Sequence, residues 1–338
     1  MDSNNIVKTL EELLKINSPT GYTIEVIEHI ENLFKDKDVI IKKTNKGSLL
    51  ISLVEDPELV LAGHIDTLGA MVKEVRKDGT LEITRLGSYP FNSFEGEYVT
   101  VRNYDGELFR GTFLLNNPAT HVNRNVGTEK RTAENMSIRL DELVRCHDDV
   151  EKLNIGVGNF VFYDVRFEHT KNGFVKSRFL DNKACSAVMI EILNEMLEKK
   201  EKYSVGFYFS NYEEVGHGAC VGIPPSVKEL LVLDMAVVGE GCTGREDAVS
   251  ICVKDSSGPY DFNVSEKLMR LAKDNKIQYE VDIYPFYGSD GSAAMAAGLD
   301  ARTGLIGPGV SASHGVERTH EKGLEATYVL ARAYIENF

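Results

Sequence analysis

The chain has 338 residues, 42% of them hydrophobic and 27% charged, which is enough for about two globular domains with separate cores. Its formal net charge of -14 comes without a Lys/Arg-rich stripe, which argues against binding to nucleic acid or anionic membranes through bulk electrostatics. Five scattered cysteines without a CxxC pair predict neither disulfides nor a thiolate zinc site, and no stretch approaches the roughly 18 apolar residues of a membrane span.

Two amphipathic helices and two strands are predicted for the start of the chain. Apolar spacing places them at residues 6–14, 26–34, 48–53 and 59–62. The second strand delivers His64 and Asp66 at its C-terminal end. Because residues two apart on an extended backbone lie on the same side, these two side chains are expected to face one point.

Between residues 68 and 164 the pattern changes to short alternating segments separated by turns. Helical periodicity in this part is confined to residues 137–143. The hairpin signal Lys171-Asn172-Gly173 then leads back to longer elements, because Asn-Gly tolerates the positive φ values of a primed turn. We therefore expect one domain of residues 1–67 plus 165–338, into which residues 68–164 are inserted as a small β-rich domain.

The last part of the chain again alternates helices and strands, which predicts an α/β fold. A predicted helix begins at Asp181, and it is followed by a strand that ends at Glu213 and a strand that ends at Asp234. Further elements are expected at residues 264–274 (helix), 288–292 (a Gly-rich segment) and 324–335 (helix).

Ionisable side chains follow several of these apolar segments. Glu213 and Glu214 are adjacent at the end of a core strand, where ionised carboxylates need a cationic partner. Five further side chains lie at strand ends or in Gly-rich turns, namely His64, Asp66, Asp181, Asp234 and His314. Histidine nitrogen combined with carboxylate oxygen suits zinc, with cobalt or manganese as alternatives. The sequence therefore predicts a hydrolytic site with two divalent metal ions, in which one glutamate binds metal and its neighbour moves the proton.

These side chains belong to five short motifs, which lie at residues 62–69, 179–185, 211–216, 233–234 and 313–315. The order of the motifs resembles that of the dinuclear aminopeptidases of metallopeptidase family forty-two, which include glutamyl aminopeptidases and the tetrahedral aminopeptidase particles. The resemblance covers almost the whole chain. It implies an α/β catalytic domain with a mixed sheet flanked by helices, as in zinc aminopeptidases, and a small β-barrel-like inserted domain.

The resemblance also implies a role for each site residue. Asp181 would bridge two metal ions, with His64 and Asp234 completing one site and Glu214 and His314 completing the other. Glu213 would be the general base. Asp66 would orient His64, a role that a carboxylate beside a ligating imidazole commonly has.

Two positions depart from the family pattern. Asn182 follows Asp181 where the family usually has a second acid, at a position that is not a metal ligand. Glu317 lies three residues after His314, where the family has an acid after four. His320 is therefore a second candidate for the last ligand, although His314 follows a Gly/Pro-rich loop and lies at the better distance from the final helix.

The predicted function is that of a dinuclear aminopeptidase that hydrolyses N-terminal residues of short peptides through a metal-bridging water. The alternatives are a deacylase or amidase that acts on a small blocked dipeptide, and a noncatalytic, metal-stabilised assembly protein. Glycoside hydrolysis is disfavoured, because adjacent glutamates on a strand point to opposite faces.

The expected partners are short peptides and further copies of the chain, with neither nucleic acid nor membrane. The resemblance implies a homo-oligomer, for which a dodecamer is one possible size, and assigns the inserted domain to oligomerisation or substrate access. The start of the chain lacks a basic segment followed by an apolar one, so a cytoplasmic location is expected.

Overall fold

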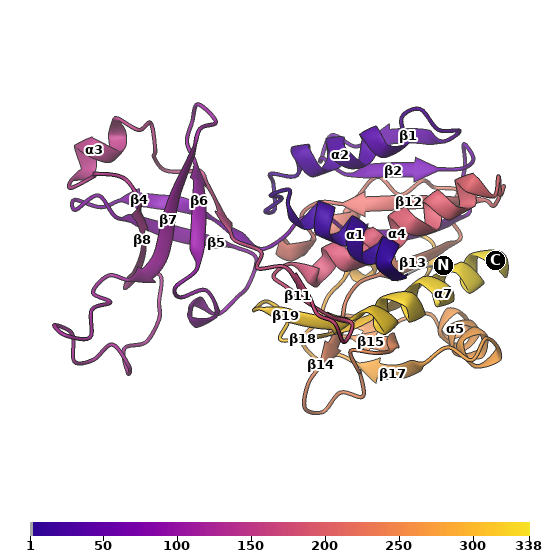
Figure 1. Ribbon diagram of the computed structural model, residues 1–338. Coiled ribbons are helices and arrows are strands. Elements are labelled where there is room, and N and C mark those ends of the chain that lie inside the picture. The colour runs from indigo at the N-terminus through magenta and orange to yellow at the C-terminus, as the bar shows by residue number, and fades with distance from the viewer. Residues whose placement is uncertain (1–2) are drawn as a thin grey trace. The chain divides into compact units, whose positions relative to one another are not determined.

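The computed structural model describes residues 3–338, and the chain divides into two compact units. The first unit comprises Met1–Thr67 and Arg166–Phe338, and the second comprises Leu68–Val165. Figure 1 shows a large sheet with helices in the first unit and a barrel in the second. Every residue singled out above as a candidate for the site belongs to the first unit.

Seven helices of the described residues lie at α1 (Ser3–Leu14), α2 (Ile24–Phe34), α3 (His147–Glu151), α4 (Leu180–Glu198), α5 (Phe262–Asp274), α6 (Asp290–Ala296) and α7 (Glu321–Glu336). Three short 3-10 turns lie at η1 (Phe91–Ser93), η2 (Glu213–Val215) and η3 (Gly218–Cys220). Helix α4 is buried on nearly all sides because it contacts α1, α7 and the sheet. Its run of small and apolar residues, with little amphipathic pattern, suits that central position.

In the first unit, thirteen strands of the described residues form one mixed sheet. The main path runs β1 (Ile40–Lys43), β2 (Leu49–Ser52), β12 (Val205–Ser210), β3 (Leu59–His64), β13 (Glu229–Leu233), β18 (Arg302–Ser311), β19 (Glu317–His320), β11 (Phe174–Ser177) and β10 (Glu168–His169). Off this path lie β14 (Ala236–Val238), β15 (Val249–Asp255), β16 (Gly258–Pro259) and β17 (Tyr279–Ile283).

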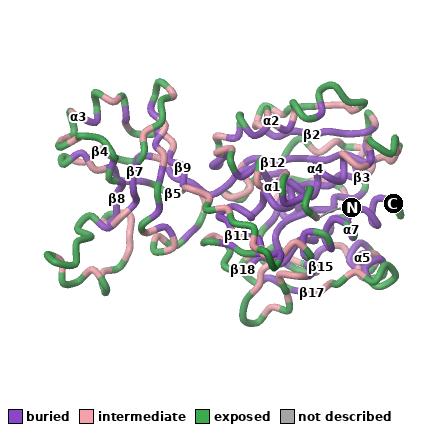
Figure 2. The backbone as a smooth tube through the Cα atoms, in the orientation of Figure 1, coloured by how far each residue is buried: buried purple, intermediate pink, exposed green. Residues whose placement is uncertain are grey.

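The centre of this sheet is parallel and covered on both faces. Strand β3 runs parallel to β12 on one side and to β13 on the other, and all six of its residues are buried. Apolar runs without alternation are typical of such strands, because helices cover both faces. Figure 2 shows these strands in the buried colour along their length.

The second unit is a closed six-stranded barrel with the order β4 (Gly69–Val75), β5 (Leu81–Leu86), β8 (Met136–Leu140), β7 (Leu108–Leu115), β6 (Tyr98–Arg102) and β9 (Phe160–Tyr163). Each strand contributes a buried side chain, and these include Val72, Ile83, Val99, Phe113, Ile138 and Val161. Closure leaves no free strand edge within the barrel.

The expected fold class, a mixed sheet flanked by helices together with a small β-barrel, is confirmed. One local prediction is wrong. The segment with helical periodicity at residues 137–143 is largely strand β8, which pairs with β7 along its whole length. Its apolar residues Met136, Ile138 and Leu140 alternate, so burial in the barrel decides the conformation over helix propensity. None of the helices among residues 3–338 combines the length and hydrophobicity needed to cross a bilayer.

Candidate metal and catalytic site

Parallel strands bring the site residues to one edge of the sheet. His64 is the last residue of β3 and pairs in register with Ser210, the last residue of β12. Asp234 directly follows β13, which runs parallel to β3. In open α/β sheets the carboxyl ends of adjacent parallel strands form the edge where ligands bind. Residues far apart in the chain therefore meet there.

Asp181 lies at the centre of the cluster and faces both histidines. Its Oδ1 atom lies 3.0 Å from Nε2 of His64, and its Oδ2 atom lies 3.4 Å from Nε2 of His314. The start of α4 is distorted to allow this, because Asp181 has the non-helical angles φ -76° and ψ 101° and Phe179 has φ 65°. A carboxylate with one oxygen toward each imidazole has the arrangement that a bridging ligand needs.

Each of the other two carboxylates of the expected ligand set lies near one of the two histidines. Oδ1 of Asp234 lies 3.8 Å from Nε2 of His64, and Oε2 of Glu214 lies 3.6 Å from Nε2 of His314. Ligand atoms of His64, Asp181 and Glu214 all lie within 4.8 Å of one another. The structure thus brings together all five side chains, as two groups that share Asp181.

The charges of the cluster call for a cation. Burial acts to lower the pKa of His64, but the surrounding carboxylates of Glu213, Asp181 and Asp234 raise that pKa well above its usual value. Burial also raises the pKa of Glu214 and of Asp234 well above the usual carboxyl range. Buried carboxylates are stable only when paired or bound to metal. Oε1 of Glu214 is buried and has no hydrogen-bond partner among the described residues. This donor set therefore fits divalent metal ions.

The tautomer of His64 also suits a ligand. Its Nδ1 atom lies 2.8 Å from the main-chain oxygen of Asp66, and a carbonyl oxygen can only accept a hydrogen bond. With a metal ion bound, a neutral His64 would keep its proton on Nδ1, and the lone pair of Nε2 would be free to bind the ion beside Asp181 and Asp234.

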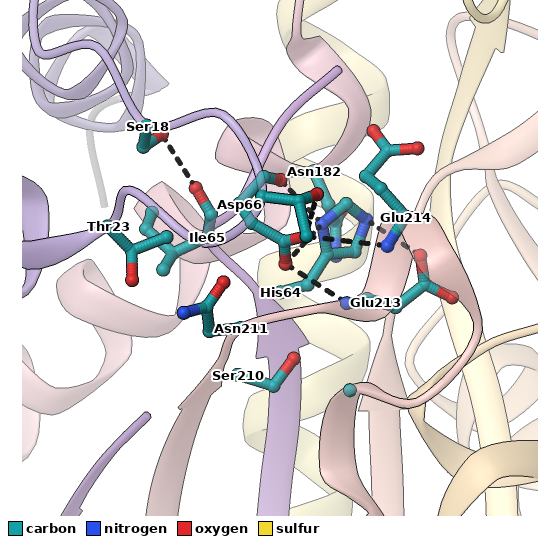
Figure 3. Close-up of polar contacts among 12 residues, drawn as sticks. Ser18, Thr23, His64, Ile65, Asp66, Asn182, Ser210, Asn211, Glu213 and Glu214 are labelled. Atoms are coloured by element: carbon teal, nitrogen blue, oxygen red, sulfur yellow. Dashed lines mark hydrogen bonds and ion pairs between the residues drawn. The ribbon is translucent and has the colours of Figure 1, made fainter. Parts of the chain in front are cut away.

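The carboxylate of Asp66 contacts the glutamate turn more closely than it contacts His64. Its oxygens accept hydrogen bonds from the main-chain N–H groups of Glu213 at 3.2 Å and Glu214 at 3.4 Å (Figure 3). They also accept one from the Thr20 hydroxyl at 2.6 Å. The carboxylate oxygen is 3.7 Å from Nδ1 of His64. The expected contact with the imidazole is thus made mainly by the main chain of Asp66, and its carboxylate holds the turn.

Glu213 and Glu214 lie on the 3-10 turn η2 rather than on the strand itself. Tyr212, with φ 74°, turns the chain away from β12 just before them. Oε2 of Glu213 is 3.7 Å from Nε2 of His64, whereas Glu214 faces His314. The Glu213 side chain is 15% exposed and the Glu214 side chain 3%. The neighbours therefore point to different parts of the cluster, and Glu213 is the more accessible of the two.

Asp290 joins the chain segments on either side of the glutamate turn, and no role was predicted for it from the sequence. Its carboxylate accepts hydrogen bonds from the Ser210 hydroxyl at 2.7 Å and from the main-chain N–H of Ala219 at 2.9 Å. A Cβ atom on Gly218 would lie 2.0 Å from Oδ1 of Asp290, so only glycine fits between Asp290 and the turn. The Gly-rich segment at residues 288–292 was the only signal for this residue in the sequence.

The structure shows where Asn182 and His320, the residues involved in the two departures from the family pattern, make their contacts. Nδ2 of Asn182 donates a hydrogen bond of 2.8 Å to the main-chain oxygen of Leu233, the residue before Asp234. His320 lies outside the cluster, because its Nδ1 atom accepts from the N–H of Lys322 at the start of α7 and its Nε2 atom lies 2.9 Å from the main-chain oxygen of Asn172. Of the two candidates for the last ligand, His314 is the one that lies beside Asp181.

We expect Gly307→Ala to disturb the Asp234 side of the site. A Cβ atom at this position of β18 would lie 1.7 Å from the main-chain oxygen of Asp234, so strand and ligand must separate. The expected loss is about 1–3 kcal/mol in the free energy of unfolding, together with weaker metal binding. Urea unfolding and metal analysis measure these effects. Gly239→Ala is the control, because a Cβ atom there meets nothing within 4 Å. Equal behaviour of the two variants would contradict the prediction.

Comparison with known proteins shows which family this chain resembles. A model of the M42 glutamyl aminopeptidase family matches residues 47–330. A protein of Bacillus subtilis (strain 168) named as a candidate aminopeptidase, YhfE, is 44% identical over 341 residues, which cover 98% of this chain and 99% of that protein.

Two solved structures share the whole fold. A TET aminopeptidase from the marine sediment archaeon Thaumarchaeota archaeon SCGC AB-539-E09 superposes with a TM-score of 0.89 at 18% identity, covering 100% of this chain and 98% of that one. The TET1 peptidase of Pyrococcus horikoshii, described as able to assemble into a tetrahedron or a large octahedral shell, has a TM-score of 0.87 at 20% identity, with coverage of 98% and 99%.

Together these findings define a metallo-aminopeptidase, a hydrolase that acts on peptide bonds. The chain belongs to the M42 glutamyl aminopeptidase family.

Proposed function

We propose that this chain removes N-terminal residues from short peptides with two divalent metal ions and with Glu213 as the general base. His64 and Asp234 would hold one ion, Glu214 and His314 the other, and Asp181 both. The observation that carries the proposal is the placement of Asp181 between the two histidines, at 3.0 Å from His64 and 3.4 Å from His314. Zinc is the proposed metal, with cobalt or manganese as substitutes.

When bound, such a pair of ions would supply Lewis-acid polarisation of the scissile carbonyl and make water a stronger nucleophile at neutral pH. The chain's own part is proton transfer and positioning. Glu213, which is partly exposed and outside the proposed ligand set, would take a proton from water and return it to the leaving amine. Asp66 would keep the Glu213 and Glu214 main chains in place through its hydrogen bonds to both.

Metal removal tests this proposal. Purified protein is assayed on a panel of aminoacyl amides and free dipeptides before and after dialysis against a chelator. We expect activity to disappear with the metal and to return when Zn²⁺, Co²⁺ or Mn²⁺ is added back, because the buried carboxylates need the cations. Peptidase activity that persists in metal-free protein would rule the proposal out.

The same panel separates the alternatives. Cleavage of acylated dipeptides without cleavage of free ones would favour the deacylase or amidase. Metal that raises the thermal stability without any turnover would favour a noncatalytic assembly protein.

The assembly and location of the chain are also proposals. The TET1 peptidase can assemble into a tetrahedron or a large octahedral shell, and a related structure holds a dodecamer. A homo-oligomer, with a dodecamer as one possible size, is the corresponding expectation for this chain. We assign residues 68–164 to oligomerisation or substrate access, and the remaining residues, 1–67 plus 165–338, to catalysis. Cytoplasmic short peptides are the proposed substrates.

A further inference from the structure

Glu317 joins two of the proposed ligands through their main chains. It is the first residue of β19 and is 1% exposed. Its Oε1 atom accepts a hydrogen bond of 3.0 Å from the main-chain N–H of His314, and its Oε2 atom accepts one of 3.0 Å from the main-chain N–H of Asp181. One buried carboxylate thus spans two segments that lie more than a hundred residues apart in the chain.

The segment that carries His314 needs such support. Ala312 and His314 have φ values of 58° and 61°, in the left-handed region that residues with a side chain seldom occupy. Strained backbone of this kind persists only where the surrounding structure determines it. A second contact also reaches the segment from the Asp181 side, because Nη1 of Arg178 donates to the main-chain oxygen of Gly315 at 2.9 Å.

The hydrogen bonds of Glu317 set the distance between the two ligand residues. Both N–H groups belong to the ligands themselves, so their backbones cannot move apart without breaking a bond to the carboxylate. The side chains that these backbones carry meet at 3.4 Å, between Nε2 of His314 and Oδ2 of Asp181. Groups that orient metal ligands in this way usually change metal affinity or activity when they are replaced.

We propose that Glu317 is a positioning residue that fixes the spacing of Asp181 and His314 and thereby sets the affinity of the site for divalent metal ions. The proposal rests on the metal site of the proposed function and adds a residue to it. It also gives a role to the acid that follows His314 by three residues instead of four. A purely structural role would instead affect stability without affecting metal affinity.

The test compares the Zn²⁺ affinity of the whole chain and its variants by competition with a fluorescent chelator. In Glu317→Gln the amide oxygen can accept a hydrogen bond from only one of the two main-chain N–H groups. The amide NH₂ group faces the other N–H, from which it cannot accept. We expect the Zn²⁺ affinity to fall by about 10–100-fold. The absorption bands of bound Co²⁺ are expected to change, because they report the geometry of the ligands. Glu317→Asp keeps the charge but is one methylene too short to reach both N–H groups, and serves if the glutamine variant does not fold.

Asp282→Asn is the matched control. Asp282 in β17 is also a buried carboxylate, and its Oδ2 atom accepts from the main-chain N–H groups of Thr243 and Gly244 at 2.8 and 3.0 Å. This variant should lose stability but keep Zn²⁺ affinity and the Co²⁺ spectrum. The inference is overturned if Glu317→Gln and Glu317→Asp keep wild-type affinity, or if Asp282→Asn loses as much. A wild-type chain that binds no Zn²⁺ would instead overturn the proposed function before any variant is compared.

Discussion

Replacing Glu213 by glutamine is expected to lower kcat by about 10²–10⁴-fold while the chain still binds two divalent ions. Glutamine has the shape of glutamate but cannot take up a proton from water at neutral pH. The Glu213 side chain is 15% exposed and lies outside the proposed ligand set, so replacing its carboxylate by an amide should leave the five proposed ligands in place. Steady-state kinetics and metal analysis of the same preparation measure both quantities.

The adjacent glutamate provides the sharpest control for this experiment. Glu214→Gln changes the same atoms one residue later, but removes a carboxylate whose Oε2 atom lies 3.6 Å from Nε2 of His314. We expect this variant to lose metal, whereas Glu325→Gln on the exposed side of α7 should behave as wild type. If the two neighbouring variants lose metal and activity in the same way, Glu213 is not a base outside the ligand set.

Replacing Asp181 by asparagine is expected to abolish binding of both ions and to lower kcat/KM by roughly 10³-fold or more. The carboxylate faces His64 with one oxygen and His314 with the other. An amide offers one oxygen and one NH₂ group, so one side of the cluster would meet a donor where a ligand is needed. Metal analysis after gel filtration gives the number of ions that remain per chain.

The prediction for Asp181 depends on the proposal that its carboxylate binds both metal ions. Asp234→Asn removes a ligand from the His64 side alone, so this variant should keep about one ion per chain. Asp38→Asn, whose carboxylate is exposed and pairs with Lys202, should keep both. If Asp181→Asn retains as much metal as Asp234→Asn does, Asp181 does not bridge.

The proximity of several candidate side chains could be predicted because they lie at recognisable places in the sequence. His64 ends an apolar strand, Glu213 and Glu214 follow another, and Asp234 follows a third. Parallel strands carry such positions to the same edge of the sheet, so local patterns and the rules for α/β folds indicate that these side chains lie near one another. Their individual roles were implied by the family resemblance and stay predictions. The alternation of strands and helices likewise predicted the α/β fold, whereas the mixed sheet was implied by the family resemblance.

The contacts that support the site could not be predicted in this way. Asp290 and Glu317 bind main-chain groups of residues more than seventy positions away, and no local pattern encodes such a pairing. Lys183 is a further example. A lysine in a helix usually faces water, but its Nζ atom donates to the main-chain oxygens of Leu13 and Ile16, and burial lowers its pKa to about 7.

The turn conformation of Glu213 and Glu214 could not be predicted from the sequence either. We expected the two residues on an extended strand, where neighbours point to opposite faces. Tyr212 instead adopts a left-handed conformation, and the pair lies on a 3-10 turn that Asp66 holds. Tyrosine seldom adopts this conformation, so tertiary contacts rather than local preference decide the turn.

The wide separation of the cluster's residues along the polypeptide has a consequence during synthesis. Translation proceeds from the N-terminus, so His64 is made well before His314. A nascent chain that has not yet reached β18 and β19 contains neither His314 nor the carboxylate that positions it. Under the proposed function, peptide hydrolysis should therefore begin only after β18 and β19 have been made and folded into the sheet.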